Sequence, residues 1–169
     1  FVYITDLKGK NGMTARGLNP VFSPDGKKLL ILKNDGLHLY DVRNYLEPKH
    51  VGLVVKTTGG RASLTMKINV SPDYKMLSWS SPGRGVVDIA RIPSWETFSL
   101  IPLRTIDRKA YWAVFSPDSR YIALEEIREK EGVEYPVIFV HDIESGSYRR
   151  ILNMTKYSKN YLWFNAWVN

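Results

Sequence analysis

The stretch that decides the fold is VFSPDGKKLL, at Val21–Leu30. It recurs as NVSPDYKML at Asn69–Leu77 and as VFSPDSRYIA at Val114–Ala123. The Ser-Pro-Asp cores of successive copies begin 48 and 45 positions apart. A repeat of this period indicates that one supersecondary unit is copied along the chain.

The repeated motif has the chemistry of a type I β-turn. Proline fixes φ at the second turn position, Asp suits the third, and Ser at the first bonds back to the turn backbone. Glycine is favoured at the fourth position, where Gly26 stands; Tyr74 and Ser119 replace it in the later copies, which a type I turn tolerates. Apolar residues flank each copy, so each is predicted to be the tip of a hairpin.

The residues after the first copy predict one complete four-stranded unit. Leu29–Leu32 is apolar on both faces, as expected of an inner strand, and Asn34–Gly36 is a second turn signal. Leu37–Val42 and Val51–Lys56 follow as the third and fourth strands. Four short antiparallel strands in about 45 residues are typical of one β-propeller blade, so we predict an all-β propeller.

Matching patterns divide the chain into five segments of a single propeller or propeller fragment over 1–169. The segments are 1–18 (a partial blade), 19–60, 61–103, 104–155 and 156–169 (a second partial blade). Phe1–Leu7 matches a third strand, and Tyr161–Val168 a first strand. Either the two ends pair and close a ring through one composite blade, or the chain is a piece of a larger propeller; we favour the piece.

Two local departures from the repeat are visible. Arg91 stands where the other blades carry Asp41 and Asp142 at the end of the third strand. In the third blade the charges alternate over Glu125–Glu134, and we expect a solvated, protruding loop there.

Composition excludes several classes of protein. The chain has 169 residues, is 44% hydrophobic and has no cysteine, which excludes disulfides and cysteine-ligated metals. No apolar run approaches the length of a membrane-spanning helix. The net charge is +7, but the basic residues are scattered, so they indicate solvated faces and no nucleic-acid partner.

Phe22–Gly26 with Tyr40–Val42, and Phe115–Asp118 with His141–Ile143, resemble the Ser-Pro-Asp-Gly, WD-like propeller repeats of TolB-like proteins. The same repeats form the propellers of prolyl oligopeptidase-type peptidases. The first resemblance implies contacts with a protein or peptide partner in a periplasmic or extracytoplasmic compartment. The second implies a propeller that gates a catalytic domain elsewhere in a longer chain. Neither resemblance assigns a role to a named residue.

The residues that most often carry chemistry show no catalytic or ligand-binding pattern. The spacing of His38, His50 and His141 matches no metal site. The serines before proline belong to turns, no Gly-x-Ser-x-Gly elbow is present, and Asp25, Asp73 and Asp118 are turn formers. We therefore predict no catalytic, cofactor-binding or metal-binding residue and no cofactor.

Other candidates have simpler explanations. Gly83–Gly85 and Thr58–Gly60 do not fit phosphate-binding spacings, and the glutamates of Glu125–Glu134 suit a charged loop better than an acid–base pair or calcium site. Asn153–Thr155 is a glycosylation sequon, relevant only to a secreted eukaryotic protein. Most of the tryptophans are expected to pack between blades; they are Trp79, Trp95, Trp112, Trp163 and Trp167. Of these, Trp95 is the best candidate for an exposed recognition residue.

The sequence favours a non-catalytic propeller that binds a protein or peptide, and therefore not an enzyme. The alternative is the accessory propeller of a prolyl oligopeptidase-type serine peptidase whose catalytic domain lies outside this chain. A carbohydrate or small-ligand propeller is a third possibility, which needs carboxylates and aromatic side chains gathered at its channel.

Overall fold

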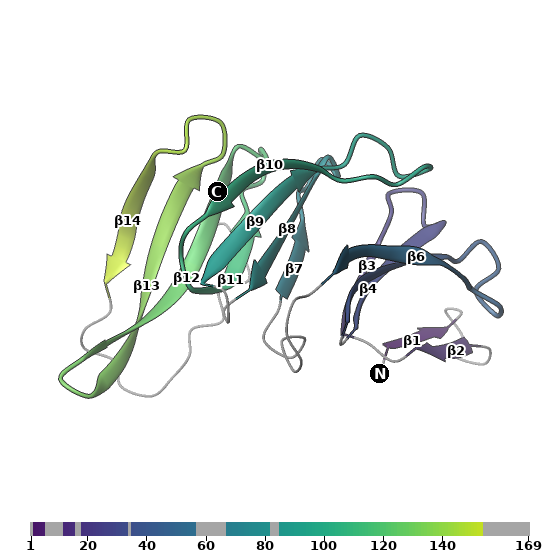
Figure 1. Ribbon diagram of the computed structural model, residues 1–169, viewed down its shortest axis with the longest axis horizontal. Coiled ribbons are helices and arrows are strands. Elements are labelled where there is room, and N and C mark those ends of the chain that lie inside the picture. The colour runs from purple at the N-terminus through teal and green to yellow at the C-terminus, as the bar shows by residue number, and fades with distance from the viewer. Residues whose placement is uncertain are drawn as a thin grey trace. The chain divides into compact units, whose positions relative to one another are not determined.

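The computed structural model describes residues 2–5, 12–15, 18–33, 35–56, 67–81 and 85–153. Within these residues every regular element is a β-strand, and the strands form one two-stranded and three four-stranded antiparallel sheets (Figure 1). This arrangement confirms the predicted all-β fold with three whole four-stranded blades. Of the two predicted partial blades, 1–18 contains the two-stranded sheet, and 156–169 lies outside the described residues. The chain divides into two compact units, Phe1–Leu64 with Pro93–Leu100, and Thr65–Ile92 with Ile101–Asn169.

The first unit holds the two-stranded sheet and one whole blade. β1 (Val2–Thr5) pairs with β2 (Gly12–Ala15). The blade has the order β3 (Leu18–Phe22), β4 (Lys28–Lys33), β5 (Gly36–Asp41) and β6 (Lys49–Lys56). Leu29–Leu32 is at most 1% exposed, so β4 is covered on both faces, as its sequence predicts.

The second unit holds the other two blades. One contains β7 (Lys67–Val70), β8 (Met76–Ser81), β9 (Val86–Arg91) and β10 (Ile101–Ile106). The next contains β11 (Ala110–Phe115), β12 (Tyr121–Lys130), β13 (Val133–Asp142) and β14 (Tyr148–Asn153). β10 passes the predicted boundary at 103 and ends at Ile106.

The two blades of the second unit share one apolar core. Val87, Ile89 and Ile106 from the earlier sheet join residues of the later one, each at most 7% exposed: Ala110, Ala113, Phe115, Ile122, Leu124 and Ile143. Burial of this apolar surface between two sheets is the main stabilising contribution to such stacking. A backbone-to-side-chain hydrogen bond joins neighbouring turns as well, since the Asp73 N–H donates to the Ser119 Oγ over 3.4 Å.

The three Ser-Pro-Asp turns have the same hydrogen-bond network. In each, the serine Oγ donates to the aspartate Oδ1 over 2.5–2.7 Å and accepts the N–H five residues later over 2.8–2.9 Å. The aspartate Oδ1 accepts the N–H two residues beyond it, over 3.0–3.1 Å. The serines are 1–3% exposed, so water does not reach their hydroxyl groups. The hydrogen bonds of the turn take the place of bonds to water.

The fourth turn position adopts the left-handed conformation in all three copies. φ is +69° at Gly26, +59° at Tyr74 and +60° at Ser119. A left-handed residue after a type I turn forms the bulge that lets the two strands continue with the right twist. The fourth turn position therefore favours glycine more strongly than a type I turn alone would, because the left-handed conformation costs free energy for other residues.

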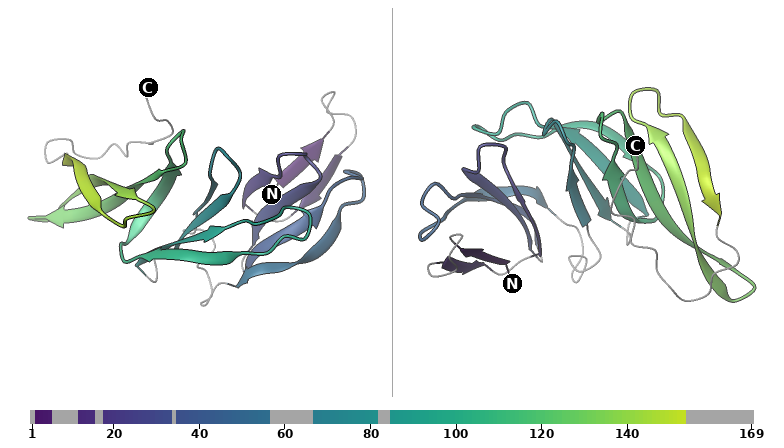
Figure 2. Two further views of the ribbon diagram at one scale, coloured as in Figure 1. Left: turned by 90° about the horizontal axis from the view of Figure 1, so that it is seen from above. Right: turned by 180° about the vertical axis from the view of Figure 1, so that it is seen from behind.

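The predicted charged loop is wrong: Glu125–Glu134 continues β12 and β13 as a ladder up to the Lys130–Val133 pair. In Figures 1 and 2 this hairpin reaches beyond the end of β14. The reason is the two-residue turn, in which Glu131 and Gly132 have φ of +55° and +75°, as a hairpin turn requires. Glu125 is only 4% exposed and so is not a solvated loop residue.

The register confirms that Arg91 replaces an aspartate of the repeat. Arg91 pairs with Met76, as Asp41 pairs with Lys28 and Asp142 with Tyr121. In all three blades the next residue donates its N–H to the same turn carbonyl, over 2.7–3.0 Å. The backbone contact therefore survives the loss of the carboxylate.

Gly26→Ala is expected to lower the free energy of unfolding by about 1–2 kcal/mol, because alanine disfavours the left-handed conformation. An added Cβ meets no atom within 4 Å, so backbone conformation alone causes the loss. Gly52→Ala is the matched control, since its Cβ also meets nothing and its φ is not positive. Urea unfolding of both variants checks the prediction, and equal losses would contradict it.

Ser71→Ala is expected to destabilise the protein by about 1–3 kcal/mol, because the Met76 N–H and the Asp73 carboxylate lose their buried partner. The exposed Ser99 provides the comparison, and Ser99→Ala is expected to change stability by less than about 0.5 kcal/mol. Thermal unfolding followed by circular dichroism distinguishes the two. A Ser71→Ala protein as stable as the parent would show that the turn does not depend on the hydroxyl.

Candidate functional site

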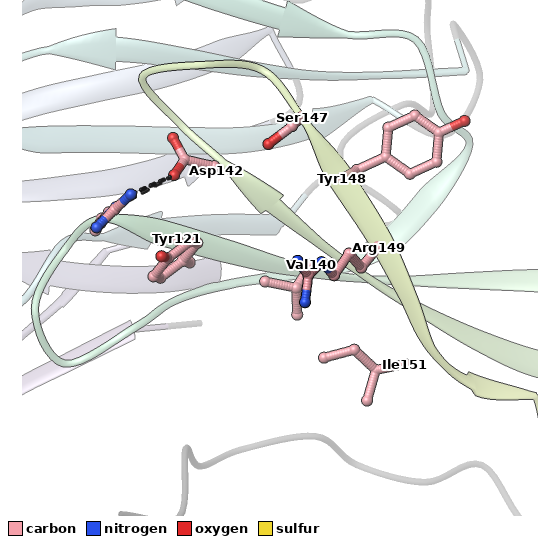
Figure 3. Close-up of a pocket in the computed structure, with 8 residues that line it drawn as sticks. Tyr121, Val140, Asp142, Ser147, Tyr148, Arg149 and Ile151 are labelled. Atoms are coloured by element: carbon pink, nitrogen blue, oxygen red, sulfur yellow. Dashed lines mark hydrogen bonds and ion pairs between the residues drawn. The ribbon is translucent and has the colours of Figure 1, made fainter.

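A groove of about 410 Å³ lies on the last sheet (Figure 3). Its lining comes from the start of β12, the end of β13, and β14 with the turn before it: Arg120, Tyr121, Val140, Asp142, Ser147, Tyr148, Arg149 and Ile151. The groove is therefore formed by one blade of the second unit.

Strand alternation determines which side chains face the groove. Tyr121 pairs with Asp142 and Val140 pairs with Arg149, so these four side chains share one face of the sheet. Tyr148 is offset by one residue, and Figure 3 shows its ring turned away from Val140 and Ile151. Tyr148 contributes to the rim of the groove, while its ring belongs to the opposite face.

The groove's carboxylate is engaged by four donors. Arg120 donates to the Asp142 Oδ2 through Nε and Nη2 over 3.2 and 3.1 Å (dashed line in Figure 3), and the N–H groups of Glu144 and Ser145 donate to Oδ1 over 3.1 and 2.9 Å. The Ser145 bond and the Arg120 guanidinium hold the pKa of Asp142 below its ordinary value. The charge of Asp142 is balanced by that of Arg120. The guanidinium of Arg149 therefore gives the groove a net positive charge, which suits a carboxylate or another anion.

The opposite face of the blade is held by an arginine between two aromatic rings. The Arg108 guanidinium carbon lies 3.8 Å from the ring centroid of Phe139 and 4.4 Å from that of Tyr148, and Nη1 lies 3.2 Å from the Glu126 carboxylate. The Tyr148 ring also stacks on His141 at 5.0 Å. This packing fixes β14 beside β13 and so fixes the groove on the other face.

His141 is buried beside these arginines. It is 4% exposed, and its Nε2 has no hydrogen-bond partner in the described part of the chain. Burial, together with the positive charges of Arg108 and Arg104, lowers the pKa of His141 to about 4. The imidazole is therefore neutral at physiological pH.

The structure brings two of the three histidines together. His38 Nδ1 lies 2.9 Å from His50 Nε2, and His38 Nε2 lies 2.8 Å from the Asp35 carboxylate; His141 belongs to the other unit. Spacing along the chain missed this pair, because a cross-strand contact between β5 and β6 has no fixed sequence interval. Within the described ranges no three His, Cys, Asp or Glu side chains gather as a metal-binding set.

The remaining sequence candidates belong to structural elements or lie outside the description. Ser23, Ser71 and Ser116 are buried in their turns. Trp95, the best candidate for an exposed recognition residue, is only partly exposed and its ring lies 5.2 Å from that of Phe98, so a recognition role for it stays a prediction. Residues outside the description include Thr58–Gly60, Gly83, Arg84, the Met154 and Thr155 of the sequon, Trp163 and Trp167.

The part of the chain that the structure describes contains no helix with the length and hydrophobicity needed to cross a membrane.

His141→Phe is expected to flatten the pH dependence of stability. The folded pKa lies below the unfolded value near 6.5, so as pH falls from 6.5 to 4 the unfolded state takes up a proton that the folded state does not, and stability is lost. At pH 5 this loss amounts to about 2 kcal/mol. Unfolding at pH 7.5 and pH 5 measures it, with His50→Phe as control. An equal pH 5 loss in the parent and in His141→Phe would refute the assignment.

Comparison with known proteins establishes the fold. No protein-family model and no curated protein matches the sequence. Solved structures do match: the Cps50 (Swd1) β-propeller domain of Myceliophteria thermophila has a TM-score of 0.63 at 15% identity, over 84% of this chain and 44% of that one. TolB from Acinetobacter baumannii has a TM-score of 0.51 at 23% identity, over 88% and 36%. The periplasmic gluconolactonase PpgL of Pseudomonas aeruginosa has a TM-score of 0.56 at 14% identity, over 82% and 40%.

This chain spans less than half the length of each of these three proteins. One of them is named as a lactonase, so the fold is shared by enzymes and by proteins whose names give no enzymatic activity. The chain is a β-propeller chain similar to TolB in fold.

Proposed function

We propose that this chain is a non-catalytic propeller module that binds an extended, acidic segment of a protein partner in the groove of the last blade. The observation that carries the proposal is a positively charged groove beside a terminal strand. β14 is the last strand in the sheet order β11-β12-β13-β14, and three of its residues line the groove. A strand in this position offers backbone N–H and C=O groups along its outer edge, to which an extended peptide adds as a further strand.

The side chains of the groove suit such a peptide. Ile151 is 65% exposed and lies near the aliphatic Val140, so alternate apolar residues of an added strand would cover it. Arg149 is exposed and Arg120 is partly occupied by Asp142, so an acidic residue on the same face of the peptide would meet a guanidinium. The net charge of +7 adds a general attraction for acidic partners.

The state of Asp142 supports a binding role over a catalytic one. An acid–base carboxylate works with a pKa near the operating pH, whereas the pKa of Asp142 is shifted downward and four donors occupy its oxygens. Among the described residues that line the groove, Asp142 is the sole carboxylate, so these residues supply no carboxylate pair.

Fluorescence anisotropy with labelled eight-residue peptides tests the proposal. The probe alternates Glu with Val or Ile, and its control carries Lys in place of every Glu. Arg149→Glu is expected to weaken binding of the acidic peptide about tenfold or more, since it reverses the charge that meets the carboxylates. Arg91→Glu is the matched control, because Arg91 is an exposed arginine on another blade and leaves the groove unchanged.

Three results with the full chain, and a fourth with a shortened chain, would overturn the proposal. One is equal binding of the acidic and lysine peptides, the second is an unchanged affinity in Arg149→Glu, and the third is a single-stranded oligonucleotide that competes with the peptide at equal concentration. The chain shortened after Asn153 is measured in parallel. Binding by the shortened chain alone would show that its own following residues occupy the groove, which also contradicts a partner site.

A further inference from the structure

The hairpin of β12 and β13 ends in a two-stranded arm, residues 127–136, which reaches past β14 (Figure 1). The pairing of β11 with β12 stops at Glu126, and the pairing of β13 with β14 starts at Val137. Beyond these points, among the described strands, β12 and β13 pair only with each other. The arm therefore presents two unpaired strand edges, and such edges pair readily with a strand of another molecule.

Strand alternation separates the charges of the arm. Glu129 and Glu134 form a cross-strand pair, and each lies an even number of positions from the groove residues of its own strand. Both glutamates therefore share the face of the sheet that carries the groove. Arg128 and Lys130 belong to the opposite face, where the Arg128 Nε lies 3.0 Å from the Glu126 carboxylate. The groove face of the arm is therefore acidic.

Glu129 and Glu134 repel each other. Both are exposed, and neither side chain forms an ion pair or hydrogen bond with another described residue. Like charges directly opposite each other in an antiparallel pair reduce stability. A cation beside the two glutamates would remove this cost. The groove of the same blade carries such a cation on the same face, the exposed Arg149.

The arm and the groove of one molecule cannot meet. Arg149 pairs with Val140, and Glu134 lies six positions before Val140 on β13. At about 3.3 Å per residue, the two positions are about 20 Å apart, which is beyond the reach of both side chains. The unbroken ladder between β12 and β13 fixes this separation. The arm can therefore enter a groove only in a second copy of the chain.

A two-fold axis perpendicular to the sheet satisfies both copies at once. β14 runs antiparallel to β13 of its own blade, and the axis reverses the strand directions of the second copy while keeping the same face up. The arm strand of β13 in the second copy then runs parallel to β14 of the first. Because the arm extends past β14, each β14 lies beside the arm of the other copy, so the contact closes as a dimer.

We propose that the acidic segment that the groove binds is the arm of a second copy, an inference that rests on the proposed function of the groove. Glu134 lies beside Arg149 of the other copy, which supplies the missing cation. On the opposite face Val133, which is 51% exposed, approaches Tyr148, which is 55% exposed, so the contact covers two exposed apolar side chains. The unpaired backbone groups of the arm and of β14 form hydrogen bonds between the copies.

Sedimentation velocity of the whole chain, from about 1 μM to about 100 μM, tests the dimer. The expected result is a rise from monomer to dimer mass with concentration, weakened by added salt. Glu134→Arg and Arg149→Glu are each expected to weaken dimerisation about tenfold or more, because each places like charges in contact. The double variant is expected to recover dimerisation, since it exchanges the two charges. Glu47→Arg is the matched control, because Glu47 is an exposed glutamate of the first unit.

Three outcomes would contradict the dimer: a chain that stays monomeric throughout the range, a Glu134→Arg variant that dimerises like the parent, or a double variant that does not recover. Recovery in the double variant also shows that both substitutions leave the fold intact. Anisotropy with the acidic peptide separates this inference from the proposed function. A monomeric chain that binds the peptide contradicts the dimer alone, whereas a chain that neither dimerises nor binds the peptide contradicts both.

Discussion

The hydrogen bond between a buried serine hydroxyl and the aspartate two residues later is the constraint on which the fold depends. It fixes the aspartate so that its carboxylate accepts the next backbone N–H, and it leaves the serine Oγ to accept the N–H that starts the following strand. Each turn thereby sets the register of a hairpin, and register decides which side chains face a neighbouring sheet. Three copies of one turn therefore give three sheets with equivalent faces.

The last blade departs most from this common plan. Its hairpin extends to ten residues in each strand, and its outer face carries the groove. It also holds two buried titratable groups whose shifts oppose each other: burial raises the pKa of Glu125, while burial and arginine charges lower that of His141. Within the described residues the Glu125 Oε2 and the His141 Nε2 have no hydrogen-bond partner, which reduces stability. The concentration of these features on one blade is consistent with a binding role there.

The sequence predicted the scaffold better than the sites. Apolar runs such as Leu29–Leu32 identified inner strands, because burial on both faces excludes polar residues at every position. The same approach placed Glu125 in a solvated loop, which was wrong. Alternating charges occur both in loops and in solvent-facing strands, so the sequence pattern does not distinguish the two. The left-handed conformation of Glu131 and Gly132 does, because it makes a tight two-residue hairpin turn.

The sequence by itself determined the repeat, the turn chemistry and the four-stranded blade, because each depends on turns and on pairing between strands that follow one another along the chain. The tertiary structure decided which distant groups meet: Arg120 with Asp142, Arg108 with Phe139 and Tyr148, and His38 with His50. These contacts cross strands or blades, and their distances follow from strand register, bulges and sheet twist. Local sequence specifies the hairpin, whereas the groove and the histidine pair exist only once the strands are aligned.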